Sequence, residues 1–294
     1  MAEPIKPLAV KPAKTSKPSI KPDIASILGL VVAFGGILGG LLMEGGKLRD
    51  VSQFTAALIV FGGTIGAVMV STPLKNLIGG LKRFKGVFFD AEVEIEGMIE
   101  EIIGFATKAR KNGLVSLEQE AFAIEDPFLK KALMLAVDGT DLQEIRKMLE
   151  LEIGLEEQHA EADAKVFECA GGYAPTVGII GAVMGLIQVM KNLANIDEVG
   201  HGIAVAFVAT VYGVGLANLF FLPAASKIKA RIHAEIQRKE LILEGVSGIV
   251  EGLNPKLIRS KLESYLPDKS PAKKEERKAD KPVKGSAPPV RAEA

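Results

Sequence analysis

The stretch Ala170–Met190 reads AGGYAPTVGIIGAVMGLIQVM and contains no charged side chain. Three further stretches share this property: Ile24–Met43, Val51–Leu74 and Gly202–Ser226. About 20 helical residues cross a hydrocarbon core of about 30 Å, and a charge at its centre costs about 2.5–3.5 kcal/mol on the insertion scale. Because 24% of all residues are charged, chance does not explain four such stretches. They predict four transmembrane helices, in preference to the buried helices of a soluble protein.

The charged residues are distributed unevenly around these stretches. The chain of 294 residues has 36 basic and 36 acidic side chains, yet residues 1–22 have a net charge of +4, residues 267–294 of +3 and residues 86–168 of −12. A zero total argues against a nucleic-acid-binding protein. One cysteine, three histidines and no metal-ligand spacing argue against a disulfide framework and a zinc site. The composition also offers no set of catalytic groups, so we expect no enzyme.

Lysine and arginine residues outside the spans predict the orientation of the chain. The loops 44–50 and 191–201 contain few of them, and acidic residues balance those few. Basic residues instead accumulate before the first span, after the second span and after the fourth, the last two groups being Lys75, Lys82, Arg83, Lys85, Lys227, Lys229 and Arg231. The positive-inside rule therefore places both termini and the segment 75–169 in the cytoplasm.

Outside the spans, the apolar spacing and the capping residues are typical of helices, and no alternating β pattern occurs. Asn112-Gly113 ends one helix, Pro127 begins another, Asp141 caps a long helix that enters the third span, and Pro255 opens a short one. We therefore predict an all-α membrane protein with four transmembrane helices, a large cytoplasmic helical domain between the second and third, and a cytoplasmic C-terminal helix. Its parts are a disordered basic tail (1–22), a transmembrane hairpin (23–74), the cytoplasmic domain (75–169), a second, channel-forming hairpin (170–226), C-terminal helices (227–266) and a disordered tail (267–294).

The spans contain glycine pairs four residues apart, among them Gly181 and Gly185. Such pairs let two helix backbones approach closely in lipid. The chain has no tryptophan and three tyrosines, so it lacks the strong aromatic belt of helices that face much lipid. These features favour a homo-oligomer with dense helix packing.

The spans contain no Asp, Glu or His, although an ion pathway needs a group that takes up and releases the ion. They do offer polar side chains and the carbonyl groups that Pro175 and Pro223 leave without a helical donor. These polar residues are Tyr173, Thr176, Gln188, Thr210, Tyr212 and Asn218. The alternative is that the two prolines merely kink their helices. If the chain conducts ions, a second chain must supply the carboxylate.

Three motifs resemble the stator A subunit of the flagellar motor, the MotA/PomA family. They are YAPTVGIIGAVMGLI at 173–187, ATVYG at 209–213 followed by Pro223, and the charged loop ARKNGLVSLE at 109–118. The resemblance covers about residues 23–265. It implies a homopentamer in the bacterial inner membrane around two copies of a MotB-type partner, which has one span and a peptidoglycan-binding domain. The partner's span would supply the channel Asp, and no cofactor is implied.

The resemblance also assigns roles to individual residues. Arg110 and Glu118 become the pair that contacts the rotor switch protein, with Glu120 as an auxiliary acid; the alternative is that these are solvated charges at helix ends. Pro175 and Pro223 match the prolines that couple ion binding to a conformational change.

The transported ion is inferred from the same comparison. Thr210 matches the family's Thr in the ion path, and we place Tyr212 beside it. Ala182 and Ala209 occupy the positions where sodium-type members carry Thr, so the resemblance favours H⁺, with Na⁺ as the alternative. Many members carry an Asp three residues before the third-span proline, where this chain has Gly172. The cytoplasmic exit would then use Glu168 or water alone.

The sequence is also compatible with two other functions. An ExbB/TolQ-like proton-channel subunit would energise an outer-membrane process, but those relatives normally have three spans and lack the charged loop. A non-conducting membrane scaffold would use the acidic segment to bind a basic partner, but it gives no reason for the combination of Pro175, Thr210 and Pro223.

Overall fold

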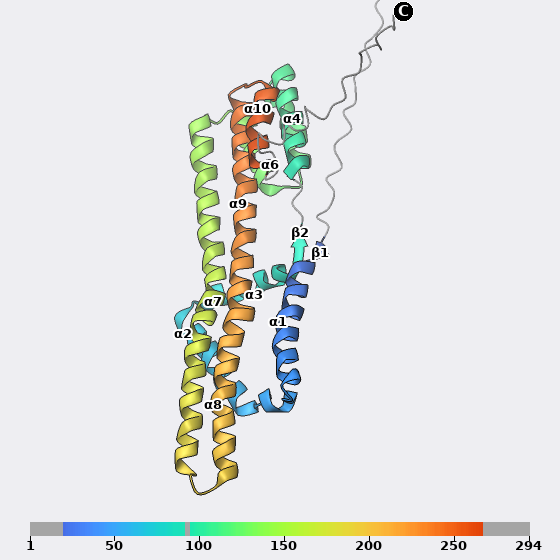
Figure 1. Cartoon of the computed structure of the whole chain (residues 1–294). Helices are drawn as coiled ribbons and strands as arrows, with labels where there is room; N and C mark the ends of the chain where they lie inside the picture. Colours follow the sequence, from blue (N-terminus) through green and yellow to red (C-terminus); the bar gives the residue numbers. More distant parts are fainter. Residues whose placement is uncertain (1–19, 92–94, 267–294) are drawn as a thin grey trace, which may run out of the picture. The chain divides into compact units, whose positions relative to one another are not determined.

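The computed structural model describes residues 20–91 and 95–266 (Figure 1). The chain is almost entirely helical. Its helices are α1 (Ile24–Met43), α2 (Phe54–Ser71), α3 (Leu74–Phe88), α4 (Ile95–Asn112), α5 (Glu118–Ala123), α6 (Pro127–Val137), α7 (Leu142–Lys191), α8 (Ile196–Leu216), α9 (Leu222–Val250) and α10 (Pro255–Leu262). Short 3₁₀ helices are η1 (Leu48–Val51), η2 (Leu114–Leu117) and η4 (Glu263–Tyr265), and η3 (Ala217–Phe221) is a π-helical turn between α8 and α9.

Four helical segments are long and apolar enough to cross a membrane: Ile24–Met43, Leu48–Ser71, Leu142–Lys191 and Ile196–Val250. Each contains all or most of one predicted span, and a large helical segment separates the second from the third. The predicted fold class, an all-α membrane protein with four membrane helices, is therefore confirmed. The division of the chain into cytoplasmic and membrane parts stays a prediction.

The helix ends follow the local signals in the sequence. Asp141 accepts a hydrogen bond from the Gln143 N–H at 2.9 Å where α7 begins. The Asp126 carboxylate accepts bonds from the first N–H groups of α6, and Pro127 occupies the first turn, where its missing N–H costs nothing. Gly113 follows α4 with φ +81°, a conformation that L side chains rarely adopt.

The second span is shorter than its charge-free stretch. That stretch runs from Val51 to Leu74, whereas α2 occupies Phe54–Ser71 and α3 begins at Leu74. Pro73 disfavours helical backbone at the preceding residue, and Thr72 has the extended values φ −131° and ψ 133°. The chain therefore leaves one helix and starts another at this dipeptide.

Two three-residue strands are an addition that the sequence did not indicate. β1 (Ile20–Pro22) pairs antiparallel with β2 (Phe89–Ala91), and the Asp23 N–H donates to the Phe88 carbonyl at 2.8 Å beside them. Three residues are too few to produce a recognisable alternating pattern. The predicted tail 1–22 thus overlaps β1 in its last three residues, and residues 1–19 and the predicted tail 267–294 lie outside the described residues.

The described chain divides into two compact units. Unit 1 contains residues 20–91 and 150–238, and unit 2 contains residues 95–149 and 239–266. Within unit 1, α7 and α8 are consecutive antiparallel helices joined by a short turn (Figure 1).

Unit 2 has an apolar core and ion pairs that hold α10. Fully buried side chains from its helices form the core, the largest being Ile102, Leu117, Leu129, Leu133, Ile145, Leu149, Leu241, Ile242, Ile258 and Leu262. Arg259 of α10 binds both carboxylate oxygens of Glu100 on α4, at 2.5 and 2.7 Å. The hydrogen-bonded Arg259 guanidinium lowers the pKa of Glu100. Glu244 on α9 contacts Arg146 at 3.2 Å and Lys261 at 2.8 Å.

Candidate functional site

The predicted ion-path residues lie where α7 and α8 are in backbone contact. A Cβ atom on Gly185 would lie 2.7 Å from the Gly202 carbonyl oxygen, and one on Gly178 would lie 2.9 Å from the Ala209 carbonyl oxygen. A Cβ on Gly213 would lie 2.5 Å from the Ala174 carbonyl oxygen. Real Cβ atoms essentially never approach within 3.0 Å. The glycines are therefore required for the two helices to pack at this distance.

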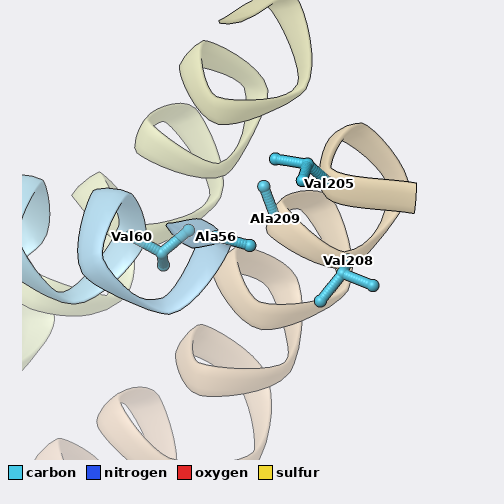
Figure 2. Close-up of a cluster of buried hydrophobic side chains, with 5 residues drawn as sticks. All are labelled: Ala56, Val60, Val205, Val208 and Ala209. Carbon is cyan, nitrogen blue, oxygen red and sulfur yellow. The ribbon is translucent and has the colours of Figure 1, made fainter. Parts of the chain in front are cut away.

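Helix α2 covers one side of this pair through small and β-branched residues. Ala56 and Val60 of α2 form a buried cluster with Val205, Val208 and Ala209 of α8 (Figure 2). Ala209, one of the two alanines expected along the ion path, is completely buried in this cluster. The other alanine, Ala182 on α7, is half-buried.

The two prolines of the spans lie in helical turns that touch. Pro175 lies inside α7 and cannot donate a hydrogen bond to the Gly171 carbonyl. A Cβ on Gly171 would lie 2.6 Å from Leu222 Cδ2, and Leu222 directly precedes Pro223. The structure thus brings together two turns that are about 50 residues apart in the sequence.

A π-helical turn precedes the second proline. The Leu222 N–H donates to the Ala217 carbonyl, five residues back, and Pro223 has no N–H to donate. The π turn contains one residue more than an α-helical turn. It therefore shifts the backbone hydrogen bonds by one residue directly before the proline. Single π turns of this kind occur frequently at functional sites.

An aromatic cluster packs around the π turn. Phe220 lies 5.3 Å from Phe84 of α3, measured between ring centroids, and Phe84 stacks on Phe167 of α7 at 5.3 Å. Phe220 also contacts Phe221 edge-on at 5.4 Å. Sequence reasoning missed this cluster, because phenylalanines in apolar helices carry no signal of which partners they meet.

Three polar side chains of the third and fourth spans bond to their own helices. Thr210 donates to the Ala206 carbonyl at 3.1 Å, Thr176 to the Tyr173 carbonyl at 2.8 Å, and Asn218 Nδ2 to the Val214 carbonyl. Thr210 is half-buried. Its hydroxyl proton is therefore already engaged within α8, and its oxygen lone pairs remain for other donors or cations.

The Tyr212 hydroxyl bonds outside its own helix, and its place in the ion path stays a prediction. Its hydroxyl donates to the Val51 carbonyl at 2.5 Å and accepts from the Gln53 N–H at 3.3 Å. It therefore ties the start of α2 to α8. No local sequence pattern indicates this bond, because its partners are about 160 residues apart.

Glu168 forms an ion pair within unit 1. Its Oε1 lies 2.6 Å from Lys229 Nζ, and the two side chains are 40% and 44% exposed. The expected cytoplasmic exit residue on α7 is thus held by a cation on α9.

The expected rotor-contact residues lie in unit 2, around the turn at Gly113. Arg110 is exposed in the last turn of α4, and Glu118 is exposed at the start of α5. Glu120 is half-buried, and its Oε1 lies 2.8 Å from Lys108 Nζ. Within the described ranges, neither Arg110 nor Glu118 has an ion-pair partner. The loop therefore presents Arg110, its neighbour Lys111 and Glu118 to solvent.

Two apolar side chains of the same part of the sequence are also exposed. Val115 is 69% exposed and Phe122 is 59% exposed. Among residues 20–91 and 95–266, no group of three or more His, Cys, Asp or Glu side chains could hold a metal ion.

Two family models match the chain. The model described as the MotA/TolQ/ExbB proton channel family matches residues 120–241, and the one described as motility protein A N-terminal matches residues 27–112. Motility protein A of Bacillus subtilis (strain 168) is 36% identical over 248 residues, which are 84% of this chain and 92% of that protein.

Solved structures agree with these matches. A chain of C. jejuni MotAB has a TM-score of 0.80 and 36% identity, and the match covers 85% of this chain and 98% of that one. A chain of the flagellar MotAB stator complex from Bacillus subtilis has a TM-score of 0.78 and 35% identity, covering 86% and 98%.

Proposed function

Since the chain belongs to the MotA/TolQ/ExbB proton channel family, as a stator subunit of the motility protein A type, we propose that it forms a proton channel with a B-type partner. The partner has one span and a peptidoglycan-binding domain. The complex lies in the bacterial inner membrane, with both ends of this chain in the cytoplasm, and converts proton flow into torque on the rotor switch ring. The solved relatives are MotAB complexes, which supports such a partner.

The contact between the Pro175 and Pro223 turns, in spans that contain no carboxylate, is the observation that carries this proposal. A channel needs a titrating group, and the partner's Asp supplies it. The Gly171 carbonyl, which Pro175 leaves without a helical donor, is available to partner groups or water. The chain thus offers a polar, adjustable surface without a charge of its own.

The free energy released when one proton crosses the membrane is sufficient for a local conformational change in these turns. Moving one elementary charge across 100 mV is worth about 2.3 kcal/mol. That amount can shift an element whose two states differ by a few kcal/mol, and we assign this role to the proline turn beside the π turn. Protonation of the partner's Asp releases it from one subunit and lets the ring of this chain step around the partner.

The ion assignment rests on the lack of oxygen ligands at two positions. Ala182 and Ala209 present methyl groups, and Thr210 is bonded to its own helix. Na⁺ needs several oxygen atoms to replace its water, whereas a proton needs a carboxylate and water. Because Lys229 already engages Glu168, we assign the cytoplasmic exit to water rather than to that carboxylate.

The assembly is a homopentamer around two copies of the partner. In the single chain, α1 has no buried residue although it is uncharged throughout. Its faces are free for lipid, for neighbouring copies or for both. The exposed Arg110 and Glu118 then form a ring of paired charges, and Glu120 supports the loop through Lys108.

Ion flux into vesicles tests the proposal. The full chain is reconstituted with its B-type partner, and uptake is driven by a potassium diffusion potential. We expect acidification that is independent of sodium and that falls about tenfold in Pro223→Ala, since alanine supplies the backbone N–H that proline lacks and so removes the interruption of the helix. Pro255→Ala, in α10, is the matched control and leaves the flux unchanged. Flux that requires sodium contradicts the ion assignment, and no flux of either ion contradicts the channel.

A further inference from the structure

Helix α3 (Leu74–Phe88) begins directly after the second membrane helix and is basic. Only Thr72 and Pro73 separate it from α2. Its sequence, LKNLIGGLKRFKGVF, contains four basic and no acidic side chains. The helix therefore starts at the height of the lipid headgroups and has a uniform positive charge.

One face of α3 is fixed against α7. Cβ atoms on Gly79 and Gly80 would lie 2.2 Å from Asp163 Oδ1 and 2.8 Å from the Asp163 carbonyl oxygen. Arg83 Nε lies 3.1 Å from Asp163 Oδ2, and Phe84 stacks on Phe167. Arg83 is thus used inside unit 1, and the rotation of α3 about its own axis is set by these contacts.

The opposite face of α3 is apolar and exposed. Leu74, Ile78 and Leu81 are 68%, 49% and 67% exposed, and their spacing places them on one side of the helix. Three lysines, Lys75, Lys82 and Lys85, are exposed within and beside this stripe. We call these six residues the outer face of α3.

An apolar stripe with flanking lysines is typical of a helix that lies in the plane of a membrane surface. The apolar side chains enter the acyl boundary, and the lysine stems extend so that the ammonium groups reach the phosphates. Anionic lipids attract such basic residues next to a span. We propose that the outer face of α3 is a binding surface for the headgroups of anionic phospholipids in the leaflet that adjoins the end of α2.

Lipid is favoured over a second copy of this chain by the charge of the surface. Two copies meeting through this face would bring six ammonium groups together, and like charges at close range repel. The face is also continuous with a membrane helix, α2, so lipid is present there at high concentration. Its apolar residues and its charges both match an anionic phospholipid.

The chain has no tryptophan, which permits a direct test with one fluorescent reporter. Leu81→Trp places it on the outer face of α3, and Met43→Trp places the control reporter at the end of α1, where Met43 is 91% exposed. Each full-length variant is reconstituted with its B-type partner. The vesicles contain brominated phosphatidylglycerol or brominated phosphatidylcholine at equal mole fraction.

We expect brominated phosphatidylglycerol to quench the Leu81→Trp variant with about two- to fivefold higher apparent affinity than brominated phosphatidylcholine, and the preference to weaken as salt rises. Adding Lys75→Gln, Lys82→Gln and Lys85→Gln to the Leu81→Trp variant should abolish its preference for phosphatidylglycerol. Lys111→Gln, Lys147→Gln and Lys256→Gln, exposed positions in unit 2, should preserve it. The Met43→Trp variant should show no preference.

Two results would overturn the proposal. Equal quenching of the Leu81→Trp variant by both lipids means that the face contacts lipid without selecting the headgroup charge. Absence of quenching by either lipid means that protein covers the face, as a second copy or the partner would. Neither result affects the proton channel, whose test measures flux.

Discussion

The Tyr212 hydroxyl donates a hydrogen bond to the Val51 carbonyl at 2.5 Å, and it also accepts one from the Gln53 N–H. The bond connects the middle of the fourth membrane segment to the start of the second. In a lipid environment an unpaired backbone carbonyl has few other donors. Tyr212 therefore fixes the entry of α2 against α8 next to the buried cluster in Figure 2.

Replacing Tyr212 by Phe removes both hydrogen bonds and keeps the ring. We expect the free energy of unfolding in detergent to fall by about 1–3 kcal/mol, the cost of leaving a buried polar group unsatisfied. Tyr173→Phe is the matched control, because Tyr173 is 37% exposed, and it should change stability by less than about 0.5 kcal/mol. Equal stability of Tyr212→Phe and the unmodified chain would show that water replaces the tyrosine.

Because α7 and α8 lie in backbone contact, we expect one methyl group added at Gly185 to lower the stability of the chain. Gly185→Ala places a Cβ atom 2.7 Å from the Gly202 carbonyl oxygen, so the helices must separate. We expect a loss of about 1–3 kcal/mol in stability, as for other overpacked sites, measured by chemical denaturation in detergent. Gly172→Ala, where nothing lies within 4 Å of the added atom, should be neutral or slightly stabilising. If both variants behave alike, the close approach of the helices is wrong.

Asp23 predicts a pH dependence of stability. It forms an ion pair with Lys227 and accepts from the Ser26 N–H at 3.2 Å. The hydrogen-bonded Lys227 ammonium lowers the pKa of Asp23 from its ordinary 3.8 to about 2. Because the pKa is lower in the folded state, the contribution is fully present above about pH 4 and is lost as the pH falls toward 2.

The measurement is the free energy of unfolding at several pH values between 2 and 6. Asp23→Asn should be less stable than the unmodified chain above about pH 4, and the difference should shrink as the pH falls through the pKa of about 2. Glu44→Gln, at the opposite end of α1, serves as the control and should follow the unmodified chain. A constant difference at all pH values would assign the effect of Asp23→Asn to something other than its charge.

We expect a substitution at Arg110 to reduce torque without reducing ion flux. Arg110→Glu reverses an exposed charge at the end of α4, far in sequence from the spans. We expect rotation speed under load to fall at least about tenfold while vesicle flux stays within about twofold, because like charges would then face each other at the rotor. Lys111→Glu, the adjacent exposed cation, should reduce rotation much less. Normal torque in Arg110→Glu would remove this residue from the rotor contact.

Much of the architecture could be predicted because its causes are local. Charge-free stretches indicated the four membrane helices, and Asp141, Pro127 and Asn112-Gly113 indicated where three helices begin or end, all of which the structure confirms. Hydropathy, capping and proline chemistry depend on a few neighbouring residues, so a single sequence contains them.

The tertiary structure decided which residues meet. The contact of the Gly171 turn with Leu222, the pairing of Glu168 with Lys229 and the bond from Tyr212 to Val51 join positions from about 50 to about 160 residues apart. Such pairings depend on how whole helices pack, and many partners are equally compatible with the local pattern. The sequence by itself thus determined the four uncharged spans and their prolines. Packing decided that the two proline turns touch, because α7 and α8 lie in backbone contact at their glycines.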